Sequence, residues 1–304
     1  MPRFPQTVLM PTVCPWDEKE QLIEGTFREL VRDLLAKGFN HLYVFGTCGE
    51  GYAVDTERFR HVVTVFREET RGKGIFPQVG AIGLSTSNVV ERIGLAHSLG
   101  FRSFQISLPS WGVLDDGEAM TFFRDVCGTF PDSTFLHYNL MRAKRLLNGA
   151  DYRRISERVP NLVATKNTSD SVLRISELMT NAPDLRHFFS EALYPHGCLL
   201  GECSILSSFG ALMPRRTWQL FNAGREGRSA EAFKLASGMA SFVNDFLAPT
   251  RGRDAVDGAY DKMLARLAGI DMPMRLLSPY ECFSEEVYQQ CRKVLLEKYP
   301  EWIG

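Results

Sequence analysis

Eight short apolar runs, separated by amphipathic stretches, are the feature that most constrains how this 304-residue chain folds. One run and the stretch that follows it span roughly 25–35 residues, the length of a βα unit. The predicted strands are Thr7–Pro11, His41–Gly46, Phe76–Ala81, Ser103–Leu108, Thr134–Asn139, Asn161–Lys166, Arg186–Ser190 and Ser204–Ser207. Eight such units favour a closed (β/α)8 barrel, the TIM-barrel class of α/β fold, over an open doubly wound sheet. No GxGxxG sequence follows the first strand, which argues against a dinucleotide-binding fold.

Three of the stretches between the strands carry clear helix signals. In Asp17–Lys37 the apolar residues recur at helical spacing, and Gly38 follows as a C-terminal stop. Asp55–Thr70 opens with an Asp-Thr-Glu capping sequence. Ser85–Leu99 opens with Ser-Thr-Ser and ends at Gly100, so we expect a helix in each of the three ranges.

The residues after the eighth predicted strand are nearly all helical in pattern. The predicted helices are Pro214–Gly224, Ser229–Leu247, Asp254–Leu267 and Ser284–Tyr299. No low-complexity linker separates them from the strands. We therefore predict one structural unit, with a barrel over residues 1–210 and an additional helical segment over residues 211–304 packed on it.

The composition excludes several classes of function. The formal net charge is −1, so no basic excess indicates binding to nucleic acid or to a membrane surface. No apolar run approaches the ~18 residues of a transmembrane helix, and the first residues lack the apolar segment of a signal peptide. The seven cysteines are scattered without a CxxC pair, and the six histidines show no HExxH spacing. We therefore expect a cytoplasmic protein with free thiols and no metal site.

Three predicted strands end in residues suited to chemistry on a carbonyl compound. Lys166 closes the sixth strand, Tyr138 lies near the end of the fifth, and Thr47 follows the second in the glycine-rich turn Gly46–Gly51. In a barrel, reactive groups gather at the C-terminal ends of the strands. Burial favours the neutral lysine amine, which attacks the keto carbon of a 2-oxo acid and forms an imine, or Schiff base. A nearby phenol relays protons, and backbone N–H groups of the turn bind a carboxylate.

Each of these residues also has a simpler interpretation. A lysine at a strand end is commonly a solvated terminus, and a tyrosine in a strand is commonly a core residue. A glycine-rich turn is commonly only a tight loop. The joint placement of an amine, a phenol and a hydroxyl at predicted strand ends is what favours a reactive site.

The ordered set of GTCGEG at 46–51, a Tyr-Asn pair ending the fifth strand and Lys166 resembles the dihydrodipicolinate synthase / N-acetylneuraminate lyase family. The similarity extends over nearly the whole chain. It implies that Lys166 forms the imine, that Tyr138 shuttles protons, and that Thr47 hydrogen-bonds Tyr138. It also implies that the amides of Thr47 and Cys48 bind the oxo-acid carboxylate. Members of the family need no cofactor and form tetramers from tight dimers, so we expect no cofactor and a homo-oligomer.

Two positions near the expected oxo-acid site depart from the family pattern. The family turn has a second hydroxyl where this chain has Cys48, which we interpret as a packing residue rather than a nucleophile. Synthases carry Pro-Tyr-Tyr after the fourth strand, and the second tyrosine completes a proton relay in the neighbouring subunit. This chain has Pro109-Ser-Trp111 there. The Trp111 indole is only a donor, so it is suited to wall a pocket or to fill a dimer contact.

The expected pocket for a second substrate also differs from that of a synthase. Ala143 stands where synthases have an arginine for the carboxylate of the aldehyde, and Arg142 and Lys144 either replace it or form a solvated basic loop. Ser190 and Glu191 either meet a hydroxylated substrate or cap the next helix. The candidate substrate-binding residues are Thr47, Cys48, Trp111, Arg142, Ser190, Glu191 and Leu206.

These departures favour a Schiff-base lyase or aldolase over a lysine-pathway synthase. The predicted substrates are pyruvate or another 2-oxo acid and an unidentified aldehyde. Two alternatives stay open, a sugar-acid dehydratase of the same family and a non-catalytic relative that binds a 2-oxo acid as a sensor. Only the enzymes need a reactive Lys166, so imine trapping separates them from the sensor.

Overall fold

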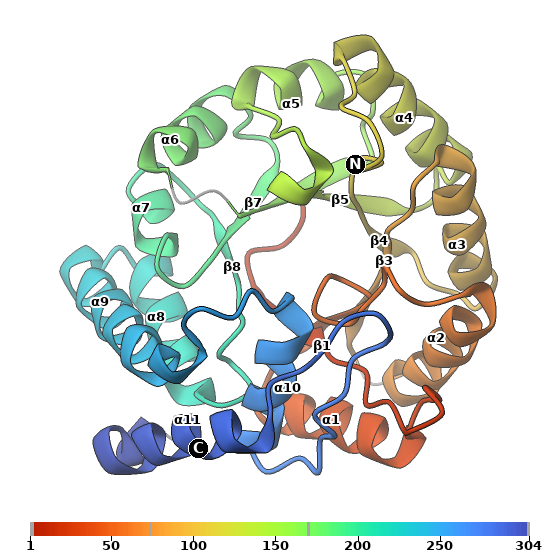
Figure 1. Cartoon of the computed structure of the whole chain (residues 1–304). Coiled ribbons are helices and arrows are strands. Elements are labelled where there is room, and N and C mark those ends of the chain that lie inside the picture. The colour runs from red at the N-terminus through yellow and green to blue at the C-terminus, as the bar shows by residue number, and fades with distance from the viewer. Residues whose placement is uncertain (1–2, 73, 169–170, 303–304) are drawn as a thin grey trace.

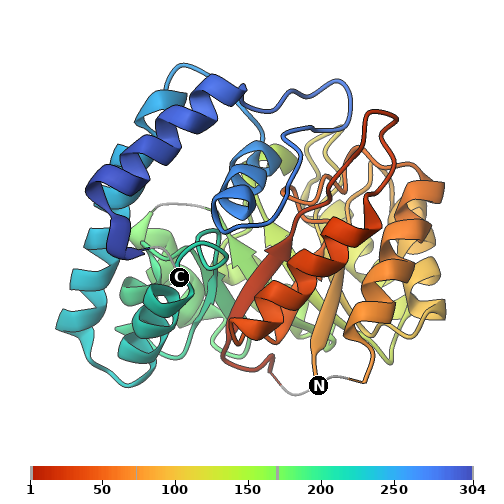
Figure 2. The same ribbon diagram turned by 90° about the horizontal axis from the view of Figure 1, so that it is seen from below.

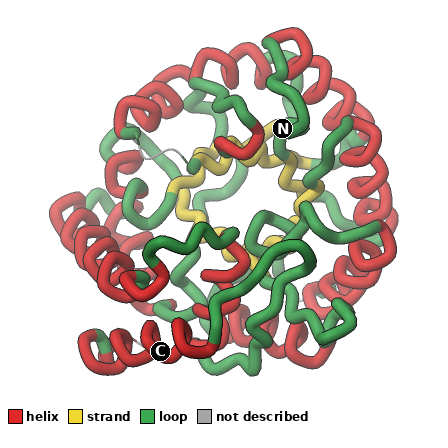
Figure 3. Tube along the Cα trace, viewed as in Figure 1, coloured by secondary structure: helices red, strands yellow, loops and turns green. Residues whose placement is uncertain are grey.

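Eight parallel strands close into a barrel at the centre of the structure, a computed structural model that describes residues 3–72, 74–168 and 171–302. The strands are β1 Val8–Thr12, β2 His41–Val44, β3 Phe76–Ala81, β4 Ser103–Ile106, β5 Thr134–Asn139, β6 Leu162–Asn167, β7 Arg186–Phe189 and β8 Ser204–Leu206. Each strand pairs with its neighbours in chain order, and β8 pairs with β1 to close the ring. Figure 3 shows this ring of strands inside a ring of helices. The predicted (β/α)8 barrel is therefore confirmed.

The strands are enclosed on both faces, by helices outside and by packed side chains inside. Every residue of β2 and β6 is buried. This explains why the sequence shows continuous apolar runs rather than an alternating pattern. Each predicted strand overlaps an observed one, and the boundaries differ by at most two residues.

The connections between strands form helices on the outside of the barrel (Figure 1). These helices are α1 Glu24–Ala36, α2 Thr56–Thr70, α3 Thr86–Ser98, α4 Asp116–Thr129, α5 Gly149–Ser156, α6 Val172–Asn181, α7 Tyr194–Cys198 and α8 Pro214–Arg225, with a 3-10 turn at Met141–Ala143. The two predicted caps are confirmed, because Asp55 accepts from the Arg58 N–H and Ser85 accepts from the Asn88 N–H. Such caps satisfy backbone donors that the first helical turn leaves free.

The first helix starts later than the sequence pattern predicts. The expected helix began at Asp17, whereas α1 begins at Glu24. The Asp17 carboxylate accepts hydrogen bonds from the N–H groups of Lys19 and Gln21, at 2.7 and 2.8 Å. An aspartate that bonds nearby backbone N–H groups stabilises a turn in competition with a helix. The prediction of a helix over Asp17–Lys37 is therefore wrong in its first turns.

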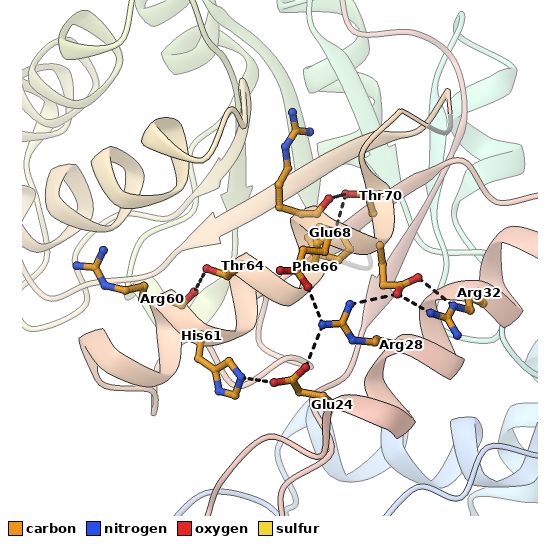
Figure 4. Close-up of polar contacts among 11 residues, drawn as sticks. Glu24, Arg28, Arg32, Arg60, His61, Thr64, Phe66, Glu68 and Thr70 are labelled. Atoms are coloured by element: carbon orange, nitrogen blue, oxygen red, sulfur yellow. Dashed lines mark hydrogen bonds and ion pairs between the residues drawn. The ribbon is translucent and has the colours of Figure 1, made fainter.

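An ionic network ties α1 to α2 (Figure 4). The Arg28 guanidinium contacts Glu24 at 2.9 Å, Glu68 at 2.7 Å and Glu69 at 3.2 Å. Arg32 adds a second ion pair to Glu69, whose carboxylate is buried. The exposed pairs with Glu24 and Glu68 stabilise a protein only modestly, whereas the buried Glu69 carboxylate needs its two arginine partners, so the network links the two helices.

The eighth helix belongs to the ring around the barrel. Trp218 of α8 donates a hydrogen bond to the Lys37 carbonyl at 3.0 Å, and its ring stacks on Phe39 at 5.1 Å. This contact closes the ring between α8 and α1. We therefore propose that the additional segment begins after Arg225, and the boundary predicted at residue 211 stays a prediction.

The additional segment packs on one flank and over the opening of the barrel. It consists of α9 Ser229–Phe246, α10 Asp257–Leu267 and α11 Glu285–Lys298, with 3-10 turns at Ala248–Thr250 and Pro300–Trp302. Figure 2 shows α9 and α11 side by side along one flank of the barrel. In Figure 1, α10 lies inside the outline of the ring, next to β1. The segment therefore brings residues from the end of the chain to the site described below.

Candidate active site

A buried ion pair fixes α10 against the glycine-rich turn that follows β2. Lys262 Nζ lies 2.6 Å from Glu50 Oε1, and neither side chain is exposed. Glu50 also accepts a hydrogen bond from the Trp16 indole at 2.8 Å. A Cβ added at Gly258 would lie 3.0 Å from the Cys48 carbonyl oxygen, so the start of α10 touches the turn. These contacts hold the first turns of α10 at the C-terminal ends of the strands.

Lys166 and Tyr138 are neighbours on adjacent strands. They are paired in the register of β5 and β6, and both side chains are buried. Lys166 Nζ lies 3.7 Å from the centroid of the Tyr138 ring and 5.7 Å from the centroid of the Tyr43 ring. The amine therefore faces aromatic rings from β5 and β2. Such contacts stabilise a cation.

The pKa of Lys166 is raised above its ordinary value. Burial lowers this pKa, but the electrostatic interactions with Tyr138, Cys48 and Asp257 raise it and prevail. Burial favours the neutral amine, as expected, but the interactions with these three groups outweigh it in the resting site. Lys166 is an ammonium group there, and it has to lose a proton before it can attack a carbonyl carbon.

Thr47 and Cys48 lie in the turn at the opening of the barrel, and both are buried. The expected hydrogen bond between Thr47 and Tyr138 is not formed, because Thr47 Oγ1 has no partner among the described residues. Cys48 Sγ lies 3.6 Å from the Tyr43 hydroxyl. Burial raises the pKa of the Cys48 thiol, so Cys48 holds a neutral thiol and fits the packing role better than that of a nucleophile.

A pocket of about 480 Å³ opens beside Thr47. Its lining residues are Thr47, Tyr52, Ala53, Ile82, Gly83, Leu84, Ser107, Leu108, Ser110, Leu140, Arg142, Ala143, Val256, Ser278, Pro279 and Tyr280. The Arg142 guanidinium is held by the Asp257 carboxylate through two hydrogen bonds, at 2.9 and 3.3 Å. This volume suits a small organic substrate. Thr47 links the pocket to the turn, whereas Lys166 lies outside the lining.

Five of the seven predicted substrate-binding residues do not line this pocket, namely Cys48, described above, and the four that follow. Trp111 is 82% exposed. Ser190 is exposed, and its carbonyl accepts hydrogen bonds from the start of α7. Glu191 is buried, and its Oε1 accepts three hydrogen bonds, from the Ser207 hydroxyl and from the backbone N–H groups of residues 208 and 209. Leu206 is the buried last residue of β8. Glu191 thus holds the loop after β8 through its Oε1 atom.

The sequence pattern missed three groups that interact with Lys166, namely Tyr43 on β2 and Asp257 and Asp261 on α10. The two aspartates are four residues apart and therefore lie on one face of the helix. The pKa of Asp261 is raised well above its ordinary value by burial and by Asp257, against the opposing effect of Lys166. The Asp-x-x-x-Asp spacing was visible in a predicted helix. Nothing in the sequence, however, showed that this helix lies over the barrel opening.

Within residues 3–72, 74–168 and 171–302, no three His, Cys, Asp or Glu side chains are grouped closely enough to hold a metal ion. None of the helices in these ranges has both the length and the apolar character needed to cross a membrane.

The fold and the site together define a class of protein, a (β/α)8 barrel with a lysine and a phenol buried at the ends of adjacent strands. The sequence matches the Dihydrodipicolinate synthetase family over residues 5–298, and the chain belongs to that family. Among its relatives is the N-acetylneuraminate lyase of Salmonella paratyphi B, which is 24% identical over 232 residues. That alignment covers 76% of this chain and 77% of the lyase.

Solved structures with the same fold cover nearly the whole chain. YagE, a prophage protein of the dihydrodipicolinic acid synthase family from E. coli K12, has a TM-score of 0.86 at 18% identity, with 96% of this chain and 97% of that one covered. The sialic acid aldolase of Ruminococcus gnavus has a TM-score of 0.82 at 17% identity, with 97% of both chains covered. At these identities the likeness shows the fold.

Proposed function

We propose that this protein is a class I aldolase-type lyase in which Lys166 forms an imine with pyruvate or another 2-oxo acid. The observation that carries the proposal is the buried Lys166 amine, 3.7 Å from the centroid of the Tyr138 ring at the ends of β5 and β6. Membership of a family that includes an N-acetylneuraminate lyase supports a carbon–carbon lyase. Further support is that YagE is described in complex with pyruvate and the Ruminococcus gnavus aldolase as a catalytic lysine mutant.

The proposed reaction begins with the carboxylate of the oxo acid at the turn after β2. The backbone N–H groups of Thr47 and Cys48 bind it, and the unpartnered Thr47 hydroxyl donates a further hydrogen bond. Lys166 loses a proton and attacks the keto carbon, and the carbinolamine loses water to give a protonated imine. This imine draws electrons from the neighbouring carbon, which becomes the enamine nucleophile or leaving carbon. Tyr138 transfers protons to and from the oxygen atoms, and the reaction requires no cofactor.

The aldehyde partner is proposed to occupy the pocket beside Thr47. Ala143 offers only a methyl group where a synthase has an arginine, and Arg142 is already paired with Asp257. Tyr52 and Tyr280 supply aromatic surface with hydroxyl groups. The pocket is therefore better suited to an aromatic or polyhydroxylated aldehyde than to a small anionic one.

A 2-oxo-acid sensor without catalysis is the second candidate. The observation that favours it is the absence of the hydrogen bond between Thr47 and Tyr138, because an incomplete proton path permits binding without turnover. A sugar-acid dehydratase would use the same imine and would differ only in the bond broken afterwards. A dehydratase is separated from an aldolase by its products, and a sensor is separated from both by imine trapping and by the lack of turnover, not by the fold.

The test is to incubate the folded protein with pyruvate and borohydride and to measure the intact mass. One reduced pyruvyl group is expected on the wild type, with peptide mapping to Lys166. Lys166→Ala should show none, and Lys37→Ala, which changes a half-buried lysine on the outside of the barrel, should keep the adduct. If folded wild-type protein gives no adduct with a panel of 2-oxo acids, the proposed function is overturned.

A further inference from the structure

Two thiols lie side by side at the end of the barrel opposite to Lys166. Cys198 is the last residue of α7, and Cys203 directly precedes β8, so both lie at the N-terminal end of that strand. Lys166 lies near the C-terminal end of β6. The Cys198 and Cys203 sulfur atoms are 3.7 Å apart, and both thiols are free. This pair is therefore separate from the proposed imine chemistry and does not depend on it.

Glycines on two helices make room for the pair of thiols. A Cβ added at Gly197 of α7 would lie 2.7 Å from the Cys203 sulfur. A Cβ added at Gly224 of α8 would lie 2.8 Å from the Cys198 sulfur. Both approaches are closer than a side chain permits, so a larger residue at either position would displace a thiol. The two sulfur atoms are thus held next to each other between α7, α8 and the start of β8.

The two thiols differ in exposure and in acidity. Cys198 is partly exposed, whereas Cys203 is fully buried. A hydrogen bond from Cys203 lowers the pKa of the Cys198 thiol, and the same contact together with burial raises the pKa of Cys203. At each of the other cysteines, all of which the structure describes, burial raises the pKa. Cys198 is therefore the cysteine with the most accessible and most reactive sulfur of the pair.

A disulfide between these residues requires only a small movement. An S–S bond is about 2.05 Å long, so the sulfur atoms have to approach each other by about 1.7 Å. Residues 199–202, which connect the two cysteines, are all exposed. Rotation of the Cys198 side chain and adjustment of this surface loop supply the movement without a change in the barrel.

We propose that Cys198 and Cys203 form an oxidation site at which hydrogen peroxide converts the two thiols into a disulfide. The Cys198 thiolate attacks one peroxide oxygen, an S–O bond forms as the O–O bond breaks, and the leaving hydroxide takes up the thiol proton to give water. The Cys203 sulfur then attacks the sulfur of the Cys198 sulfenic acid, the S–O bond breaks, and the second hydroxide leaves with the Cys203 proton as water. The two thiols lose two electrons in total, and one peroxide is reduced to two molecules of water.

The test is to treat the folded protein with hydrogen peroxide, to alkylate the remaining thiols, and to measure the tryptic peptides without a reductant. Residues 187–215 form one tryptic peptide that contains both cysteines. This peptide should lose two hydrogen atoms and escape alkylation, and dithiothreitol should restore both thiols. Cys198→Ser should form no disulfide. Cys282→Ser, which removes another partly exposed thiol, should form it as the wild type does.

The order of attack has its own test. Cys203→Ser should stop at the sulfenic acid, which dimedone traps on Cys198. Dimedone should label Cys198 roughly tenfold faster than Cys282, which is also partly exposed but has a raised pKa. Equal labelling of the two residues would overturn the assignment of Cys198 as the attacking thiol.

The wild-type measurement decides the proposal even if a variant fails to fold. If the wild-type peptide keeps both thiols after peroxide treatment, the oxidation site is overturned. If Cys198 is oxidised to sulfinic acid and no disulfide forms, Cys203 does not resolve the sulfenic acid, and the proposal is again overturned. Borohydride trapping of pyruvate reports on the proposed function alone, so either result can fail without the other.

Discussion

Lys166 Nζ lies 3.7 Å from the centroid of the Tyr138 ring, and the two residues are paired across β5 and β6. This arrangement gives Tyr138 two separable properties. Its ring stabilises the ammonium form of Lys166, and its hydroxyl supplies a proton donor and acceptor. A substitution that keeps the ring and removes the hydroxyl therefore isolates the proton transfer.

Tyr138→Phe should keep the fold and the contact with Lys166 but lower turnover by roughly 10²–10⁴-fold, the usual effect of losing a general acid–base group. Steady-state kinetics with the best aldehyde and a thermal unfolding curve would measure both effects. The reduced pyruvyl adduct should still form, more slowly than in the wild type. Unchanged turnover in the Phe variant would mean that Tyr138 is only a packing residue.

The rate of imine formation should rise with pH. Because Tyr138, Cys48 and Asp257 outweigh burial and raise the pKa of Lys166, the nucleophilic neutral amine is the minor form near pH 7. Below that pKa the neutral fraction grows about tenfold per pH unit. Borohydride trapping at saturating pyruvate between pH 6 and 9 would measure the slope. Pyruvate keeps the same charge over this range, so a flat or falling profile would contradict the raised pKa.

The strand framework was readable from the sequence because each strand is a short buried run closed by a turn. The run ending in Lys166 and the one containing Tyr138 were placed within a residue of β6 and β5. The start of α1 could not be predicted in the same way. The Asp17 carboxylate accepts hydrogen bonds from nearby backbone N–H groups, and the helix begins only after that turn. Periodicity shows which residues face the core, but it does not show local competition for backbone N–H groups.

Only part of the site could be predicted from the sequence, because some of its residues come from a segment far along the chain from the strands. Thr47, Tyr138 and Lys166 follow the rule that strand ends carry the chemistry, so their placement at the strand ends was predictable. Asp261 comes from a helix that folds back over the opening, and no local pattern reveals that docking. The sequence also did not show that the Trp111 side chain is exposed. A tryptophan after the fourth strand fits a pocket wall and an outer surface equally well.

The buried ion pair between Glu50 and Lys262 should make a large contribution to stability. Either Glu50→Gln or Lys262→Met leaves the partner charge buried and unpaired, which typically costs about 3–5 kcal/mol. The double variant should cost less than the sum of the two, because it leaves no unpaired charge. Urea unfolding of the four proteins would measure the cycle.

A matched control for that experiment is the exposed pair of Lys293 and Glu297, whose charged atoms are 3.8 Å apart. Lys293→Met should change the free energy of unfolding by less than about 0.5 kcal/mol, because solvent screens an exposed pair. If the lysine substitution lowers the free energy of unfolding equally at the two pairs, burial does not explain the contribution of Lys262 to stability.

Wild-type protein should be a poor dihydrodipicolinate synthase. The Arg142 guanidinium is already hydrogen-bonded to the Asp257 carboxylate, so it is not free to bind the carboxylate of aspartate semialdehyde. Asp257→Asn frees that guanidinium for a carboxylate and should raise kcat/KM for aspartate semialdehyde by roughly tenfold relative to an uncharged aldehyde. Adding Arg142→Ala should remove the gain. Robust condensation of pyruvate with aspartate semialdehyde by the wild type would overturn this account of specificity.

Trp111 should act in self-association rather than in aldehyde choice. Its side chain is 82% exposed, and Leu84, Val113 and Met141, on the loops that follow neighbouring strands, are at least 60% exposed. A group of large exposed apolar side chains indicates a contact surface, and we expect a second copy of the chain to cover it. Trp111→Asp should therefore reduce the mass measured by sedimentation at micromolar protein, whereas Leu296→Asp on α11 should not. If the mass is unchanged and Trp111→Ala shifts the aldehyde preference instead, Trp111 belongs to the substrate pocket.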